Sequence, residues 1–373
     1  MAIDEGTKKI LALWLIPGLG PRKIAMLVNF FENINQIFDA SIQQLIKVDG
    51  INHQIADEIK TILTSKRLHG ELSLIEKNQL NILSIQSDHY STTLKEIYSP
   101  PPILYQKGNI DYQKGLFIGI VGSRKASFAG KSFCEKLIQQ LAAYRNDIVI
   151  VSGLALGIDT IAHQTALENN LKTIAVLAGG LSDIYPAKNK NLARQIAEQG
   201  AIITEFPVST KPVAQNFPLR NRIISGLSSG IIVIEAGEKS GALITANYAI
   251  EQNRELFAVP GPVDSSFFIG TNRLIQKGHA KLIMDAGDIL EELDTSFKRS
   301  VKTSKSLTSK QFDYLSEQET LVIDCLKTGA LTQNKLSEEL KIPINILLGI
   351  LTALELKGMI IIKSGSIVQL LQF

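Results

Sequence analysis

The sequence predicts an α/β protein whose central part is a doubly wound, mostly parallel sheet, with a small helical module before it and another small domain after it. Between Leu116 and Leu293, short apolar runs alternate with amphipathic segments, the pattern of parallel strands joined by helices. The runs are continuous, which is typical of strands covered on both faces. With 373 residues and 45% apolar side chains, the chain can fill the cores of two or three domains.

Residues 1–90 are expected to form an all-helical module of the SAM or helix-hairpin-helix kind. Apolar residues recur at three-to-four spacing, and turns at Pro17–Pro21 and Val48–Ile51 interrupt them. The first turn is similar to a helix-hairpin-helix hairpin, in which backbone amides meet a phosphate and basic side chains add charge. The candidate residues for this contact are Gly18, Gly20, Arg22 and Lys23. The second turn lacks the second glycine, so packing alone is the alternative for it.

Three prolines in Ser99–Pro102 exclude a helix and favour an extended arm, so a domain boundary is expected there. The central domain then covers residues 98–295. Its expected strands are the apolar runs at 117–122, 148–153, 172–180, 201–206, 230–236, 255–261 and 280–284. Residues 296–311 are rich in Ser, Thr and Lys and contain no acidic residue, which predicts a flexible basic linker.

Residues 312–373 are expected to form a winged helix, because three helical segments precede two apolar runs around Ser364–Ser366 that are typical of a β-hairpin. The third helical segment, residues 343–358, is the one that would enter a DNA major groove. It carries one Glu, one Lys and no Arg. Contact with a protein partner is therefore favoured over DNA reading.

Three stretches of the central domain, residues 112–134, 184–197 and 206–234, contain basic residues and no acidic residue, although the net charge of the whole chain is only +3. These residues are Lys114, Arg124, Lys125, Lys131, Lys188, Lys190, Arg194, Lys211, Arg220 and Arg222. Loops that follow parallel strands share the carboxyl edge of the sheet, so two of the stretches are expected to bring their cations into one crevice. The ligand of such a crevice would be anionic. The alternative is a set of solvated surface charges.

Gly122, Ser123 and Arg124 follow the first of these strands, and a helix begins shortly after. Backbone amides, the Ser hydroxyl and the Arg fork can all face a phosphate at such a helix start, and the glycine allows close approach. The loop is not a dinucleotide or ATP motif, because G-x-G-x-x-G is absent and Gly130-Lys131-Ser132 lacks the earlier glycine of a P-loop. No cofactor is therefore expected.

Two polar groups flank the apolar run Ile231–Ile234, which is expected to be a buried strand. They are the cluster Arg220, Asn221 and Arg222 and the turn Ser240-Gly241. Polar groups at the carboxyl end of a parallel strand open into a crevice, so this arrangement favours an anionic ligand. For the turn, helix capping by Ser240 is the alternative.

Asp159 and His163 lie at an expected helix start after the second strand of the central domain. An acid and a histidine one helical turn apart are also the parts of a catalytic dyad. We favour a structural role, because an Asp at a helix start usually satisfies free backbone amides and a lone His is usually structural. No second His or Cys lies nearby in the sequence, so no metal site is expected.

Cys134 and Cys325 are far apart in the sequence, which suits reduced, buried thiols of a cytoplasmic protein better than a disulfide framework. The first twenty residues have acidic residues before a short apolar run, unlike a secretory signal or a transit peptide. No apolar segment is long enough to span a bilayer. A cytoplasmic location is therefore expected.

Several ordered segments of the central domain resemble the DNA-processing protein A family, also called DprA or Smf. The segments are Val121–Arg124, Ser152–His163, Leu177–Leu192, Asn216–Ser228, Glu235–Gln252, Phe257–Gly261 and Gly270–Gly278. Together the resemblance covers residues 98–290. One departure is His279, which stands between Gly278 and Ala280 where the family pattern runs from Gly to Ala directly.

The resemblance implies an extended Rossmann-like domain that binds single-stranded DNA without base specificity and forms a homodimer. It also implies a protein that protects incoming DNA, helps to load RecA during natural transformation and is not an enzyme. The expected DNA-binding residues are Gly122, Ser123, Arg124, Lys188, Asn189, Lys190, Arg220, Asn221, Arg222, Ser240 and Gly241. The choice between Lys188 and Lys190 as the phosphate contact stays open.

A second hypothesis is a nucleotide phosphoribohydrolase, because Rossmann-like proteins of the lysine-decarboxylase-like group have that activity. Those enzymes carry a P-G-G-x-G-T-x-x-E turn, and Ala236–Gly241 lacks this pattern and its downstream glutamate. A third hypothesis is an adaptor whose winged helix recruits protein partners.

Overall fold

The computed structural model describes residues 3–297, 316–327, 329–356, 359–363 and 366–370. The chain divides into two compact units, residues 1–299 and residues 300–373. Most of the expected basic linker, residues 298–311, lies outside the described residues.

The first unit is built on a nine-stranded sheet with the strand order β1-β2-β6-β5-β4-β3-β7-β8-β9. The strands are β1 Asn81–Ser84, β2 Ile103–Gly108, β3 Leu116–Val121, β4 Ile148–Ser152, β5 Lys172–Val176, β6 Ala201–Thr204, β7 Gly230–Val233, β8 Glu255–Ala258 and β9 Lys281–Leu282. Every neighbouring pair from β6 to β9 is parallel, whereas β1 and β2 pair antiparallel at one edge. The predicted doubly wound, mostly parallel α/β fold is confirmed.

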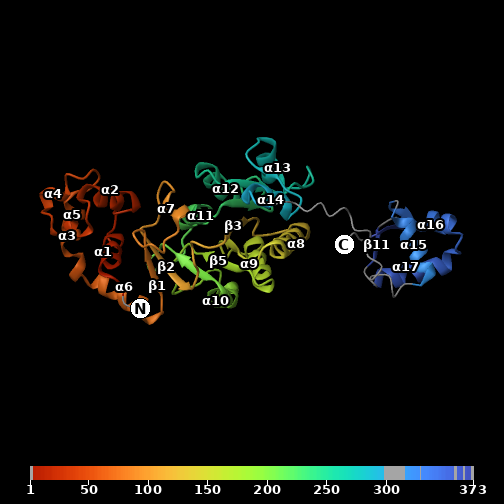
Figure 1. Cartoon of the computed structure of the whole chain (residues 1–373), viewed down its shortest axis with the longest axis horizontal. Helices are drawn as coiled ribbons and strands as arrows, with labels where there is room; N and C mark the ends of the chain where they lie inside the picture. The colour runs from red at the N-terminus through yellow and green to blue at the C-terminus, as the bar shows by residue number, and fades with distance from the viewer. Residues whose placement is uncertain (1–2, 298–315, 328, 357–358, 364–365, 371–373) are drawn as a thin grey trace. The chain divides into compact units, whose positions relative to one another are not determined.

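Helices cover both faces of this sheet (Figure 1). One face carries α8 Phe128–Tyr144, α9 Ile158–Glu168, α10 Lys190–Gln199 and α14 Ala286–Leu293, and the other carries α7 Thr92–Lys95, α11 Asn216–Leu227, α12 Ala242–Glu251 and α13 Ile269–Gln276. The alternation along β3 divides its side chains between them, because Ile118 and Ile120 pack on the α8 side and Phe117 and Val121 on the α11 side.

The amino-terminal helices lie beside the β1–β2 edge of the sheet (Figure 1). They are α1 Glu5–Trp14, α2 Pro21–Phe31, α3 Ile34–Asp39, α4 Ile42–Leu45, α5 His53–Thr61 and α6 Lys66–Lys77, with a 3₁₀ turn η1 at Ile62–Thr64. Their apolar side chains share one core with Tyr105 of β2 and Ile202 of β6. The structure differs from the all-helical reading of residues 1–90 in one respect, because residues 81–84 form β1. The alternation in this short segment is hidden by the helical periodicity before it.

The described residues of the second unit form three helices and a three-stranded antiparallel sheet in the order β10-β12-β11. Its elements are α15 Glu317–Leu326, β10 Leu331–Thr332, α16 Gln333–Leu340, α17 Ile344–Leu356, β11 Ile360–Lys363 and β12 Ile367–Leu370. Three helices and a closing hairpin were expected here; Ser364 and Gly365 in the expected turn lie outside the described residues. The assignment as a winged helix stays a prediction.

Cys134 is a buried residue of α8, as expected. Cys325, in the second unit, is only partly buried and donates its thiol hydrogen to Glu339 over 3.2 Å. The expectation of two buried thiols is therefore wrong for Cys325, because α15 turns this side chain toward the surface of α16. None of the described helices combines the length and apolarity that a bilayer crossing requires.

Candidate functional site

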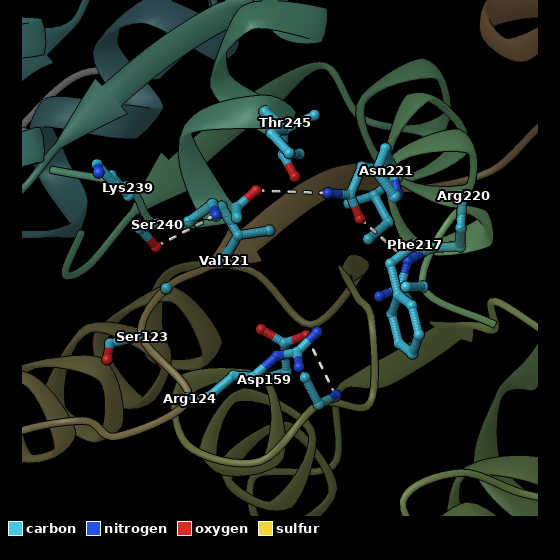
Figure 2. A pocket seen from close by; sticks show the side chains of 18 of the residues that line it. Val121, Ser123, Arg124, Asp159, Phe217, Arg220, Asn221, Lys239, Ser240 and Thr245 are labelled. Atoms are coloured by element: carbon cyan, nitrogen blue, oxygen red, sulfur yellow. Dashed lines mark hydrogen bonds between the residues drawn. The ribbon is translucent and has the colours of Figure 1, made fainter. Parts of the chain in front are cut away.

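The strand order reverses at the carboxyl ends of β3 and β7. The chain adds β4, β5 and β6 on one side of β3 and then returns through α11 to add β7 on the other side. A crevice forms at such a point because the helices that follow the two strands pack on opposite faces of the sheet. A cavity of about 900 Å³ lies here, with walls from the loops after β3, β4, β5, β6 and β7. Figure 2 shows side chains from these loops and from α11 around one space.

The β3–α8 loop, residues 122–127, places Gly122, Ser123 and Arg124 in the cavity wall, where the sequence predicted a phosphate site. A Cβ on Gly122 would lie 2.6 Å from the side chain of Ile158, so only glycine allows α9 to pack this closely. Arg124 is exposed, and its guanidinium lies 5.2 Å from the centre of the Phe217 ring. This loop therefore combines an exposed cation with a tightly packed backbone.

Glu235, which follows β7, fixes the position of this loop by hydrogen bonds. Its side chain is fully buried and accepts hydrogen bonds from the amide and the hydroxyl of Ser127, the amide over 3.0 Å. Ser127 in turn caps α8 by accepting from the Gly130 amide over 3.0 Å. A Cβ on Gly130 would lie 2.3 Å from the Glu235 carboxyl carbon. Glu235 thus links the two strands that form the switch point.

The cluster Arg220, Asn221 and Arg222 is divided among three environments. Arg220 reaches the cavity but is 4% exposed and donates to the carbonyl oxygens of Gly153, over 2.7 Å, and Val176. Burial lowers the pKa of its guanidinium to about 10, so it keeps its charge at neutral pH. Arg220 thus contributes positive potential to the cavity while its donors hold the ends of β4 and β5.

Arg222 does not line the cavity, which corrects its place in the expected site. It is buried and forms an ion pair with Glu205, whose carboxylate is also buried. Successive helical residues point about 100° apart, so α11 cannot present three consecutive side chains to one ligand. Asn221 does line the cavity, and its side-chain amide donates to the Gly241 carbonyl over 3.4 Å.

The β7–α12 turn, residues 237–241, closes the cavity opposite the β3–α8 loop. Ser240 and Gly241 line it as predicted, and the Ser240 hydroxyl accepts from the Ala242 amide over 3.3 Å. The helix-capping alternative for Ser240 is wrong, because Gly241 is the N-cap of α12 and that helix has no side-chain cap hydrogen bond. Lys239 in the same turn is exposed and lines the cavity as well.

Asp159 lines the cavity but does not cap its own helix, because Gly157 occupies the N-cap position of α9. Its carboxylate accepts from the amides of Gly153, over 3.1 Å, and Ala155, over 3.3 Å. Burial raises the pKa of this carboxyl, and the charge of Arg220 opposes the rise. Asp159 therefore fixes the β4–α9 loop rather than the helix start.

His163 is fully buried away from the cavity, and its Nδ1 lies 2.7 Å from the Thr173 hydroxyl. That hydroxyl donates to the Ile150 carbonyl over 2.8 Å, so His163 is the donor to it. Burial lowers the pKa of the imidazole to about 3, with a smaller effect of the Arg220 charge, which keeps the ring neutral. These contacts give His163 a structural role, because they join α9 to Thr173 of β5 and, through its hydroxyl, to β4.

The segment after β5 contributes less than the resemblance implied. Lys188 is exposed and Lys190 pairs with Asp183 over 3.3 Å, and neither lines the cavity. Asn189, in the 3₁₀ turn η2 at Ala187–Asn189, is buried and donates to Leu154 over 2.9 Å. The expectation of a phosphate contact from this amide is corrected, because it donates to the Leu154 carbonyl of the β4–α9 loop and to the Thr160 hydroxyl of α9.

The amino-terminal hairpin lies outside the cavity. Gly18 has a φ of +78°, which glycine adopts freely, and Gly20 is the N-cap of α2. The Lys23 ammonium donates a hydrogen bond to the Gly18 carbonyl over 3.0 Å, so it is used within the turn itself. The guanidinium of Arg22 lies 3.9 Å from the centre of the Tyr98 ring, which is itself 80% exposed.

Phe217, Tyr185 and Lys239 line the cavity, although they were not among the expected DNA-binding residues. Phe217 and Tyr185 form an edge-to-face pair at the cavity, with ring centres 5.9 Å apart. Lys239 adds a cation, and an exposed lysine in a turn after a strand was the available signal for it. The ion pairs among the described residues leave Arg124, Lys125 and Lys239 without an acidic partner. Nowhere in the described residues do three His, Cys, Asp or Glu side chains gather as potential metal ligands.

The sequence model of the DNA recombination-mediator protein A family matches residues 81–294. The chain belongs to this family. The match begins at Asn81, the first residue of β1, earlier than the resemblance in the sequence indicated. DNA processing protein DprA of Bacillus subtilis is 45% identical over 223 residues, which is 60% of this chain and 74% of that protein.

Solved structures of DNA processing protein A agree with this assignment. The X-ray structure from Streptococcus pneumoniae aligns with a TM-score of 0.69 at 36% identity, over 78% of this chain and 99% of that one. The Helicobacter pylori protein, whose single-stranded DNA binding mode has been described structurally, aligns with a TM-score of 0.53 at 31% identity, over 59% of this chain and 98% of that one.

Proposed function

We propose that this chain binds single-stranded DNA without base specificity in the cavity at the β3–β7 switch point. The observation that carries the proposal is the set of three exposed cations, Arg124, Lys125 and Lys239, that face this cavity without acidic partners. The single-stranded DNA binding of the Helicobacter pylori relative supports the same ligand.

The cavity suits a sugar-phosphate chain better than a small nucleotide. Cations on two of its walls match a ligand with several phosphates, and the groups that hold the backbone read no base edge. The Phe217 and Tyr185 rings give a surface on which any base can stack. Asp159 already accepts two backbone amides, which argues against its use as the acid of a phosphoribohydrolase.

Replacing Arg124 by Ala tests the proposal. Binding of single strands should weaken for every base sequence alike, and the slope of log K against log salt should become shallower by about 0.7, the value for one lost single-strand phosphate contact. Titration of labelled oligonucleotides at a series of salt concentrations measures both quantities. Lys172→Ala is the matched control, because Lys172 is exposed at the amino end of β5, on the opposite edge of the sheet.

Two results would count against the proposal. An unchanged salt slope for Arg124→Ala would remove the cavity as the phosphate site. Preference for a duplex in a competition between single- and double-stranded oligonucleotides would direct attention to the helical hairpin and the second unit.

The variants Lys188→Ala and Lys190→Ala, titrated with oligonucleotides at the same salt concentrations, decide whether either lysine contacts the strand.

We further propose that the protein is a cytoplasmic homodimer that protects incoming DNA and helps to load RecA during natural transformation. Membership of a recombination-mediator family supports this role. Ile344, Ile346 and Leu348 of α17 are exposed apolar side chains, which favours a protein partner for the second unit. Sedimentation of the full chain, alone and with RecA, tests both associations.

A further inference from the structure

We infer that the bound strand leaves the cavity across the amino terminus of α8 and stacks one base on Phe128. The inference rests on the proposed single-stranded DNA binding and extends it to a site outside the cavity. Phe128 is the first residue of α8, and its side chain is 87% exposed.

Phe128 is not needed for the packing of α8. The helix is anchored by Cys134, Leu137, Ile138 and Leu141, which pack toward the sheet. The Phe128 ring therefore has no role in the core, and its exposed face is available for stacking with a base.

The position of Phe128 is continuous with the cavity. Lys125 lines the cavity and stands in the β3–α8 loop, three residues before Phe128. The backbone between them is held in place, because Ser127 caps α8 and donates to Glu235. The start of α8, which carries Phe128, is therefore held in place three residues after a residue of the cavity wall.

The charges around Phe128 also fit a nucleic-acid strand. Lys131 is exposed and lies three residues further along α8, which places it on the same face of the helix as Phe128. No acidic residue occurs between Asp111 and Glu135, and none of the ion pairs found in the described residues involves Lys125 or Lys131. Two cations that flank an exposed ring can hold successive phosphates while the intervening base stacks.

The test compares Phe128→Ala with the full-length wild type on oligothymidylates and on oligomers of equal length whose central units lack bases. Phe128→Ala should lose about five-fold or more in affinity for long oligothymidylates, the lower end of the range for base–aromatic stacking. It should lose little for the abasic oligomers. Its salt slope should stay at the wild-type value, because no phosphate contact is removed.

Three further variants separate stacking from other effects. Phe128→Tyr should restore affinity and Phe128→Leu should not, since leucine keeps the apolar volume but has no ring face. Ile250→Ala is the control for loss of an exposed apolar side chain, because Ile250 is 41% exposed in the last turn of α12.

Equal losses on thymidylate and abasic oligomers, or wild-type affinity of Phe128→Ala for every length, would overturn the inference. Wild-type DNA binding combined with an altered oligomeric state would assign Phe128 to a contact between copies of the chain and would overturn it as well. If Arg124→Ala weakens binding while Phe128→Ala does not, the cavity stands and only the stacking site fails. If the wild type does not bind single strands at all, the proposed function itself fails.

Discussion

At the residue scale, burial decides which charged side chains can reach a ligand. Arg124 and Arg220 both line the cavity, yet Arg124 is exposed and Arg220 is enclosed by backbone carbonyls. Arg222, two residues further on, is paired with Glu205 in the interior. A basic residue in a suggestive motif is therefore a ligand contact only if the fold leaves its donors free.

His163 makes the stability of the protein sensitive to acid. Its pKa is about 3 when folded against an ordinary 6.5, so the unfolded chain binds the proton first as the pH falls. Stability from this group is complete above pH 6.5 and is lost as the pH falls toward 3. Between about pH 7.5 and about pH 5, wild type should lose about 2 kcal/mol more free energy of unfolding than His163→Asn, measured by urea denaturation. Equal losses would show that His163 does not titrate this way.

Glu235 should position the β3–α8 loop through its two hydrogen bonds from Ser127. Glu235→Ala leaves these donors without partners, so we expect a loss of about 1–3 kcal/mol in stability together with weaker binding of single strands. Glu235→Gln can accept from the Ser127 amide and donate to its hydroxyl, so it should retain both properties. Thermal unfolding and oligonucleotide titration of the two variants measure the difference. Equal DNA affinity of the two variants would contradict a positioning role.

At the element scale, the cavity depends on how closely two turns approach. Gly157, the N-cap of α9, has a φ of +83°, and a Cβ there would lie 2.2 Å from the Ser123 carbonyl oxygen. The turn before α9 thus fixes the position of Ser123 in the β3–α8 loop. The sequence of either turn alone does not predict this contact, because it joins residues that follow different strands.

Gly157→Ala should therefore displace Ser123 and Arg124. The strained backbone and the clash should cost about 1–3 kcal/mol in the free energy of unfolding, and single-strand affinity should fall with it. Gly70→Ala is the control, because Gly70 lies within α6 with open space around its Cα, and alanine there should be neutral or stabilise by up to about 1 kcal/mol. Wild-type stability and affinity of Gly157→Ala would show that the loop does not rest on this contact.

At the scale of the whole molecule, the amino-terminal helices and the sheet form one body. Trp14 of α1 donates its indole hydrogen to the Glu205 carbonyl over 2.7 Å, and Glu71 of α6 accepts from the Val208 amide over 2.7 Å. These contacts join α1 and α6 to the loop after β6. Within residues 3–297, α1 and α6 therefore help to stabilise this edge of the sheet.

The division into two units predicts that residues 1–299 fold and bind single strands without the rest of the chain. The truncated protein should keep the main thermal transition and the salt slope of the full chain, because its core and its cavity are complete. Calorimetry and oligonucleotide titration test this expectation. Loss of single-strand binding on truncation would place an essential contact in the second unit.

The sequence by itself determined the doubly wound sheet, the loop at Gly122–Arg124 that follows its first parallel strand and the polar turn at Ser240, because apolar periodicity and turn chemistry act over a few residues. Tertiary structure alone decided that Arg222 and Asn189 are used internally, that Phe217 and Lys239 reach the cavity, and that β1 joins the sheet. These outcomes depend on helix rotation and on contacts between distant segments. The physical reason is that burial of a side chain depends on the packing of distant segments, which a short sequence pattern does not predict.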